Sequence, residues 1–281
     1  MDLTELKKIW KEHGFRPNKR LGQNFLIDNN IRDKILSFLP IGKDDTVVEI
    51  GPGFGAMSLA LADLCGRLIA VEKDTKMCGI LDPLLKKRGN IELCNGDILE
   101  TDFRRIAFGK EKIFIFGNIP YYISTPLMEK VINDREKVRG LYIVIQEEVA
   151  DRIVAPPGSK TYGSLSCYVQ YFAAVKKLFR IKKQAFCPSP KVESALLGMD
   201  MLASPSVQVR DEALMLEIIR KAFSQRRKKA VNPLVSADVA GMGKAEWEHI
   251  FMECGISAAA RAETISLADY ARIADAVSAQ R

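Results

Sequence analysis

The stretch that decides the fold lies between residues 47 and 55 and reads Val47-Val48-Glu49-Ile50-Gly51-Pro52-Gly53-Phe54-Gly55. Its first half is rich in β-branched apolar residues, which is typical of a buried strand. Its second half has three glycines at alternate positions, and glycine permits both a sharp turn and a close approach of a ligand to the backbone. The stretch therefore predicts a strand that runs directly into a ligand-binding loop.

Further short apolar segments follow, separated by segments of helical periodicity. The predicted strands cover residues 46–50, 67–72, 91–94, 113–117 and 141–145. Alternation of strands and helices indicates the α/β class, with a mainly parallel sheet that is covered on both faces. Ligands of such sheets bind at the carboxyl ends of the strands. We therefore look for functional residues where each strand ends.

The two ends of the chain have a helical pattern instead. Residues 1–15 predict a short helix, and Asp28 is a candidate cap for a second one. After a break near Ala203-Ser204-Pro205, residues 211–281 show only helical periodicity. We therefore expect two domains, a catalytic domain over residues 1–203 and a small all-α domain over residues 204–281.

Composition limits the classes of function. Of 281 residues 47% are hydrophobic and 27% are charged, as in ordinary globular proteins, and the net charge is +7. Such a surplus favours a polyanionic partner, although many basic proteins bind none. The basic residues cluster at Lys19-Arg20, at 176–183 and at Arg226-Arg227-Lys228-Lys229. The bland interpretation of each cluster is a solvated face.

Several classes of site are not expected. The six cysteines are scattered without a C-x-x-C pair, so the sequence predicts neither a zinc site nor a disulfide framework. The N-terminus has no apolar leader segment, and no stretch is long and apolar enough to cross a bilayer. We expect a cytoplasmic protein with reduced thiols, no metal and no membrane contact.

Acidic residues stand at three successive strand ends. Glu72 ends the second strand, 21 residues after Gly51, a position from which a carboxylate binds ribose hydroxyls. Asp97 follows the third strand and is suited to accept a hydrogen bond from an adenine amino group. Glu49, just before the glycine loop, would oppose a pyrophosphate but suits a cationic ligand. The G-x-G-x-G spacing also departs from the dinucleotide fingerprint. Together these features favour S-adenosylmethionine over a nicotinamide dinucleotide.

The fourth strand runs through Gly117 into Asn118-Ile119-Pro120-Tyr121, the most specific motif in the sequence. It resembles the [N/D/S]-[P/I/L]-P-[Y/F] motif of amino-methyltransferases that act on adenine N6. The lone pair of an adenine amine is delocalised into the ring, and accepting hydrogen bonds from both N–H groups would localise it. The Asn118 oxygen is expected to accept one, and the carbonyl of Pro120 or Ile119 the other. Tyr121 offers a stacking face for the base, worth about 1–3 kcal/mol.

No strong general base is expected, because the nitrogen becomes acidic as it gains the methyl group. The two histidines, His13 and His249, agree with this because neither lies near a strand end. Catalysis would then depend on positioning and polarisation.

Nearly the whole chain resembles the rRNA adenine N6,N6-dimethyltransferase family, the KsgA/Dim1 branch. The segments that carry the resemblance are 19–26, 118–126, 146–149, 162–166, 186–194, 222–228 and 261–266. It implies a Rossmann-like class I S-adenosylmethionine-dependent methyltransferase fold. It also implies that six residues bind the cofactor, namely Asn24, Leu26, Gly51, Glu72, Asp97 and Asn118. Phe186 is expected to cover the other face of the target base, which makes Asn118, Pro120, Tyr121 and Phe186 the catalytic set.

The resemblance also implies the substrate. It is two adjacent adenines in the hairpin near the 3′ end of small-subunit rRNA, presented by the immature small ribosomal subunit and everted into the pocket. Arg226, Arg227, Lys228 and Lys229, with the basic residues of 176–183, would bind phosphates. Three residues depart from the family pattern: Val231 and Pro233 stand where a basic and a small polar residue are usual, and Tyr122 replaces an amide residue. We expect a monomer.

Two alternatives stay open. One is a large-subunit rRNA adenine methyltransferase that confers antibiotic resistance, against which the tail segments 222–228 and 261–266 argue. The other is a non-catalytic rRNA-binding assembly factor, which the complete motif at 118–121 disfavours. An adenine deaminase is disfavoured because its H-x-E and P-C-x-x-C zinc signature is missing.

Overall fold

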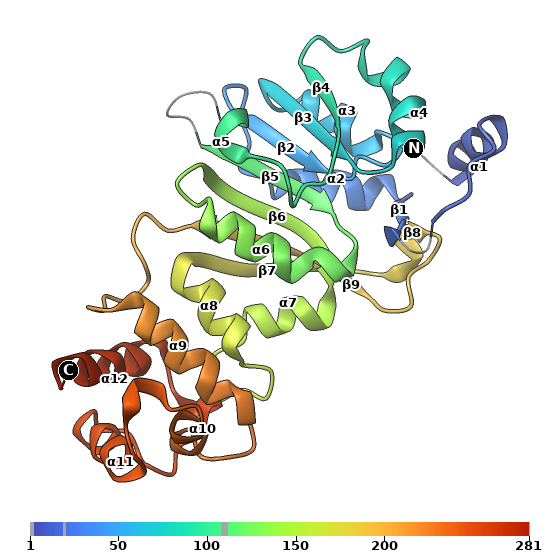
Figure 1. The fold of residues 1–281 in the computed structure, drawn as a ribbon. Coiled ribbons are helices and arrows are strands. Elements are labelled where there is room, and N and C mark those ends of the chain that lie inside the picture. The colour runs from blue at the N-terminus through green and yellow to red at the C-terminus, as the bar shows by residue number, and fades with distance from the viewer. Residues whose placement is uncertain (1–2, 19–20, 108–111, 281) are drawn as a thin grey trace. The chain divides into compact units, whose positions relative to one another are not determined.

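A computed structural model of the chain describes residues 3–18, 21–107 and 112–280 (Figure 1). The basic pair Lys19-Arg20, which opens one of the family-like segments, lies outside the described residues. Contacts divide the chain into two compact units, residues 1–150 with 176–201 and residues 151–175 with 202–281. Each unit is described by itself.

The first unit is built on a sheet that has seven strands within the described residues, in the order β4-β3-β2-β5-β6-β9-β7. These strands are β2 (Thr46–Ile50), β3 (Arg67–Glu72), β4 (Ile91–Asn95), β5 (Ile113–Asn118), β6 (Val138–Gln146), β7 (Ala173–Ile181) and β9 (Ser194–Met201). The five strands predicted from the sequence are present and pair in parallel from β4 to β6. The predicted α/β class with a mainly parallel sheet is therefore confirmed. A short antiparallel pair, β1 (Phe25–Leu26) and β8 (Phe186–Cys187), stands apart from the sheet.

Antiparallel β9 is the main addition to the predicted sheet. It pairs with β6 along its whole length, from Gly140 opposite Asp200 to Gln146 opposite Ser194. This register brings the start of β9 to the carboxyl end of β6, so Ser194 reaches the edge at which the parallel strands end.

The helices of the first unit are distributed along its chain, with α1 and α2 before β2 and the others after parallel strands. They are α1 (Leu3–Glu12), α2 (Asn29–Ser37), α3 (Ala56–Ala62), α4 (Thr75–Leu85), α5 (Phe103–Ile106), α6 (Ser124–Asn133) and α7 (Glu147–Ile153), whose last turn belongs to the second unit. Asp28 caps α2 by accepting from the backbone N–H groups of Asn30 and Ile31 at 2.9 and 3.1 Å, as predicted. Asp74 caps α4 in the same way. These caps fix the turns that follow the strands.

Two apolar clusters hold the helices onto the sheet. One joins Ile35 of α2 and Leu61 of α3 to the strands β2, β3 and β5. The other joins Leu6 of α1 to Met77 and Leu81 of α4. The predicted N-terminal helix therefore covers the region above β3, where the rings of Trp10, Phe15, Phe25 and Phe54 pack at centroid distances of 4.8 to 6.2 Å.

The second unit is mostly helical, as the periodicity of the tail predicts (Figure 1). Its helices are α8 (Ser164–Phe172), α9 (Glu212–Ala222), α10 (Val231–Ser236), α11 (Lys244–Glu253) and α12 (Leu267–Ala279). Trp247, Phe251 and Tyr270 are fully buried in its core. The division at Leu202 lies close to the predicted boundary at 203/204, but residues 151–175 belong with the tail and not with the catalytic body. The reason is that α8 packs on α9, with the Tyr171 hydroxyl donating to Glu212 at 3.1 Å.

The tight turn before β3 gives a first testable prediction. A Cβ added at Gly66 would lie 2.4 Å from the Lys43 carbonyl oxygen, whereas one added at Gly89 would meet nothing within 4 Å. Because a backbone oxygen cannot move aside cheaply, Gly66→Ala should lower the free energy of unfolding by about 1–3 kcal/mol. Gly89→Ala, the matched control, should change it by less than about 0.5 kcal/mol. Urea unfolding of both variants measures the difference, and equal stabilities would contradict the prediction.

Candidate active site

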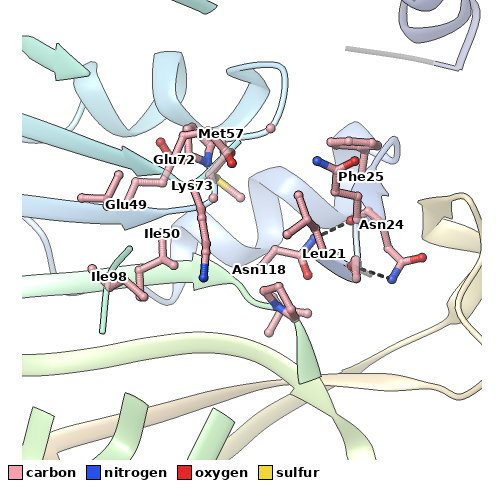
Figure 2. Close-up of a pocket in the computed structure, with 18 of the residues that line it drawn as sticks. Leu21, Asn24, Phe25, Glu49, Ile50, Met57, Glu72, Lys73, Ile98 and Asn118 are labelled. Carbon is pink, nitrogen blue, oxygen red and sulfur yellow. Dashed lines mark hydrogen bonds between the residues drawn. The ribbon is translucent and has the colours of Figure 1, made fainter. Parts of the chain in front are cut away.

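A pocket lies at the carboxyl ends of β2 to β5, within the first unit (Figure 2). Its wall includes most of the residues that the sequence predicts for the site: Asn24, Leu26, Gly51, Glu72, Asp97, Asn118, Pro120 and Phe186. Residues separated by up to 162 positions in the sequence (Asn24 to Phe186) therefore share one cavity. Tyr121 is the predicted site residue that is not part of this wall.

The floor of the pocket is main chain. Gly51 and Gly53, which both line the pocket, have φ values of +64° and +57°, which L side chains rarely adopt. A Cβ added at Gly51 or at Gly96 would meet no atom within 4 Å, although both glycines line the pocket. A side chain at either position would therefore project into the open space of the pocket. Such a cradle fits a ligand that lies directly against the backbone.

Glu72 and Asp97 stand on one side of the pocket in different electrostatic states. Glu72 is 8% exposed, and its Oε1 accepts from the Asp74 backbone N–H at 2.8 Å. Burial raises the pKa of Glu72 to about 7, partly offset by hydrogen bonds from the backbone. Asp97 accepts from Lys73 Nζ at 2.6 Å and from the Leu99 N–H at 2.9 Å. The Lys73 ammonium lowers the pKa of Asp97, so this carboxylate stays ionised.

Lys73 is a pocket residue that the sequence analysis missed (Figure 2). The signal was present, because Lys73 directly follows Glu72 at the end of β3. Its partner is 24 residues away, however, and only the sheet brings the ends of β3 and β4 together.

Glu49 is the most deeply buried acid of the site. It is 2% exposed, lines the pocket, and its Oε2 has no hydrogen-bond partner among the described residues. Burial raises the pKa of Glu49 to about 8, with smaller opposing influences of the nearby Ser58 hydroxyl and the Glu72 charge. A buried oxygen without a partner is costly, and a cationic group in the pocket would relieve that cost.

Asn118 is held in one orientation by the loop that precedes β1. Its Nδ2 donates to the Asn24 carbonyl oxygen at 2.8 Å (Figure 2). Because a carbonyl can only accept, this bond assigns the amide and leaves Oδ1 as the acceptor for another group. The same loop contacts the next turn, since a Cβ added at Gly22 would lie 3.0 Å from Pro120 Cβ. The opening motif thus contacts both Asn118, at the end of β5, and the turn that follows it.

Tyr121 is oriented by a contact with the start of β9. Its hydroxyl lies 3.1 Å from Ser194 Oγ, at the buried start of β9, and the ring is half-buried beside Pro120. Phe186 lines the pocket and is 4% exposed, and its backbone pairs with Leu26 between β8 and β1. Exposed Tyr122 also lines the pocket, which is where one departure from the family pattern lies.

The basic residues predicted to bind RNA lie in different surroundings. In 176–183, Lys177 and Arg180 form ion pairs with Glu147 at 3.5 and 3.0 Å within the first unit. In the second unit, Arg226 to Lys229 are all exposed. Val231 is 1% exposed and Pro233 is buried at the start of α10, so these two departures serve the core of the helical unit.

Metal sites and membrane-spanning helices are two further features on which the geometry and hydropathy of the described residues bear. Among the residues described, no three His, Cys, Asp or Glu side chains are grouped so that they could hold a metal ion. Among those same residues no helix is long and apolar enough to cross a membrane.

Comparison with known proteins identifies the family. Residues 14–278 match the family described as ribosomal RNA adenine dimethylase. The chain belongs to this family. The predicted enzyme class, an rRNA adenine dimethyltransferase that uses S-adenosylmethionine, is thereby confirmed.

Individual relatives match nearly the whole chain. Ribosomal RNA small subunit methyltransferase A of Pelotomaculum thermopropionicum is 39% identical, over 96% of this chain and 94% of that protein. The protein of the same name from Clostridium acetobutylicum is 36% identical, over 96% and 97%.

Solved structures share the fold. A dimethyladenosine transferase from Plasmodium falciparum has a TM-score of 0.74 at 24% identity, covering 89% of this chain and 95% of its own. The 23S rRNA methyltransferase ErmE has a TM-score of 0.71 at 20% identity, covering 91% and 100%. These likenesses confirm the predicted class I methyltransferase fold.

The raised pKa of Glu49 gives a testable pH dependence. Between the ordinary pKa of 4.5 and about 8, folded Glu49 keeps a proton that the unfolded chain releases. The folded state then binds more protons, so the stabilisation is complete below pH 4.5 and is lost as the pH rises to about 8. Glu49→Gln should remove this contribution, which is at most about 1.4 kcal/mol per pH unit. Urea unfolding of the ligand-free protein from pH 5 to 8.5 measures it, and parallel stability profiles for both proteins would contradict the assignment.

Proposed function

We propose that this enzyme dimethylates N6 of two adjacent adenines in the 3′-terminal hairpin of small-subunit rRNA, as part of ribosome assembly. The observation that carries the proposal is the fixed Asn118 amide, whose oxygen is left as an acceptor in the pocket that Gly51, Glu72 and Asp97 line. The relatives at 35–39% identity, all named for the small subunit, support the choice of substrate over the large-subunit alternative. The likeness to ErmE is one of fold and does not favour that alternative.

The cofactor would lie along the main-chain floor of the pocket. Glu72 would accept from the ribose hydroxyls and Asp97 from the adenine amine. Glu49, buried and with no partner for Oε2 in the described part of the chain, would face the cationic part of the molecule. Asn24 and Leu26 would close the wall beside Asn118. When bound, S-adenosylmethionine supplies an electrophilic methyl group.

The residues after β5 would prepare the target amine as a nucleophile. Asn118 Oδ1 would accept one N–H. The Pro120 carbonyl already accepts the Ile123 N–H at 3.1 Å within the turn at Tyr121–Ile123, so we assign the second N–H to the Ile119 carbonyl. Hydrogen bonds accepted from both N–H groups favour a nitrogen whose lone pair is no longer delocalised into the ring, and preorganised acceptors achieve this without reorganisation. The proton lost on transfer passes to solvent.

Aromatic rings would hold the everted base. Tyr121 would stack on it, with the ring held by the contact of its hydroxyl with Ser194. Phe186 would cover the other face from β8. Arg227, Lys228 and Lys229 would bind phosphates in the helical unit, where their side chains are exposed. The protein would act as a monomer in the cytoplasm, where small subunits mature.

A labelling experiment tests the choice of substrate. The protein is incubated with methyl-labelled S-adenosylmethionine and either immature small subunits or large-subunit rRNA. We expect label in the small-subunit rRNA as N6,N6-dimethyladenine at two adjacent positions. Label in the large-subunit rRNA alone would support the resistance-type alternative, and no label in either would support the assembly factor.

Substitution of Asn118 tests the proposed chemistry. Asn118→Ala should lower kcat by at least about 10²-fold, because one preorganised acceptor is lost, while cofactor affinity stays mostly intact. Asn133→Ala, an exposed position on α6, serves as the control. Single-turnover transfer and equilibrium binding of S-adenosylhomocysteine separate the two effects. Undiminished transfer in Asn118→Ala would exclude the role assigned to it.

A further inference from the structure

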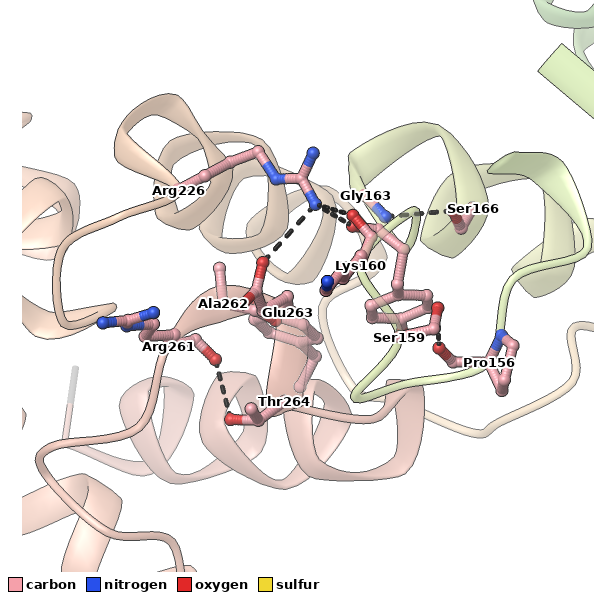
Figure 3. A network of polar contacts seen from close by, with 12 residues as sticks. Pro156, Ser159, Lys160, Gly163, Ser166, Arg226, Arg261, Ala262, Glu263 and Thr264 are labelled. Atoms are coloured by element: carbon pink, nitrogen blue, oxygen red, sulfur yellow. Dashed lines mark hydrogen bonds and ion pairs between the residues drawn. The ribbon is translucent and has the colours of Figure 1, made fainter. Parts of the chain in front are cut away.

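The first arginine of the basic run is engaged inside the helical unit (Figure 3). Arg226 Nη2 donates to the carbonyl oxygens of Lys160 and Tyr162 at 2.7 and 3.0 Å, and it lies 3.4 Å from Glu263 Oε2. All three contacts are made by the single Nη2 group at the far end of the guanidinium. Arg226 therefore connects two segments, the 158–163 loop and residues 261–264, that are about 100 residues apart in the sequence.

The 158–163 loop is fastened at its other points as well. The Gly158 N–H donates to the Glu263 carbonyl at 2.7 Å. At the end of the loop, the Gly163 N–H donates to Ser166 Oγ at 3.0 Å. The Tyr162 ring is buried and packs edge-on against Phe223 at 5.9 Å. The tip at Lys160 is exposed, and the Arg226 bond holds its carbonyl.

The charge of Arg226 is also matched. Its pairing with Glu263 leaves no net charge at this point, whereas Arg227, Lys228 and Lys229 are exposed and have no resolved acidic partner in the described part of the chain. Phosphate binding gains most from releasing the counterions of the nucleic acid, and a pair without net charge contributes little to that release. Arg226 therefore contributes to this surface indirectly. By binding the Lys160 carbonyl, it holds the exposed Lys160 beside the basic run.

We propose that Lys160 is a phosphate contact of the RNA-binding surface and that Arg226 is the positioning residue that holds it there. The inference rests on the proposed function, because it assigns part of the surface that would receive the small-subunit rRNA. It differs from the sequence-based prediction, in which Arg226 itself binds a phosphate. The surface then combines residues 227–229 with a loop from the region between α7 and α8.

The test compares how salt weakens RNA binding in a set of variants. The full-length protein binds a small-subunit rRNA fragment that contains the 3′-terminal hairpin, in a series of KCl concentrations. The variants are Lys160→Gln, Arg226→Gln, the double variant of both, and Arg226→Lys. Arg227→Gln serves as a reference for a phosphate contact, and Lys244→Gln on α11 as a control for loss of charge elsewhere in the unit.

A lost phosphate contact reduces the slope of log K against log[KCl] by about 0.9 for a duplex. We expect that loss in Lys160→Gln and again in Arg226→Gln, but no further loss in the double variant. Arg226→Lys should behave like Arg226→Gln, because a lysine keeps the charge but its side chain is one atom shorter and does not place a nitrogen where Nη2 lies. Additive losses in the double variant, or a wild-type slope in Arg226→Lys or in Lys160→Gln, would overturn the proposal.

Hydrogen exchange gives a second, independent readout. Amides of residues 158–163 should exchange faster in Arg226→Gln than in wild type and stay unchanged in Arg227→Gln, and equal exchange in all three would overturn the positioning role. Because the variants lie in the helical unit, slow exchange of the amides around the buried Trp247, Phe251 and Tyr270 checks that this unit is folded in each of them. If the wild-type protein does not bind this RNA, the proposed function fails and the inference with it. Additive losses in a protein that does bind contradict the inference alone.

Discussion

The hydrogen bond from Asn118 Nδ2 to the Asn24 carbonyl joins two segments that lie 94 residues apart in the sequence. Asn24 lies in the loop that precedes β1, and Asn118 is the last residue of β5, paired with Val144 of β6. The strand fixes the backbone of Asn118 but not the rotation of its amide group. An amide group can present either an acceptor or a donor to a ligand, and only its other hydrogen bond decides which. In Asn118, the bond from Nδ2 to the Asn24 carbonyl leaves Oδ1 as the acceptor for the ligand. The chemistry that we propose for the target amine therefore depends on a contact made outside the motif itself.

The acids around the pocket show how one sheet edge can hold groups of different charge. Burial favours the neutral forms of Glu49 and Glu72, whereas Lys73 keeps Asp97 ionised. All three lie at or just beyond the carboxyl ends of parallel strands and line the same cavity. What differs is the neighbouring charge, since Lys73 pairs with Asp97, whereas the charge that acts on Glu49 is the acid Glu72. A ligand with one cationic centre and several hydrogen-bond donors is matched by this distribution.

Much of the first unit could be predicted from the sequence because its signals are local. The strand at 46–50 is indicated by five consecutive residues, and the helix cap at Asp28 is indicated by Asp28 and the three residues that follow it. Candidate residues at strand ends follow from topology, which explains why Gly51, Glu72 and Asp97 were found. The ion pair of Lys73, the contact of Tyr121 with Ser194 and the engagement of Arg226 were not found, because each needs the distance between remote segments. The same holds for residues 151–175, whose place in the helical unit depends on packing of α8 against α9.

The glycines at 51 and 96 have a consequence for how this enzyme can diverge from its relatives. A surface made of main-chain atoms is the same whatever residues surround it, so it offers no side chain that mutation could adjust. A larger residue at either position would project into the cavity. The side chains that can adjust the fit of the methyl donor belong to the walls, among them Met57 and Ile98. The pocket thus combines a base of main-chain atoms with walls of side chains.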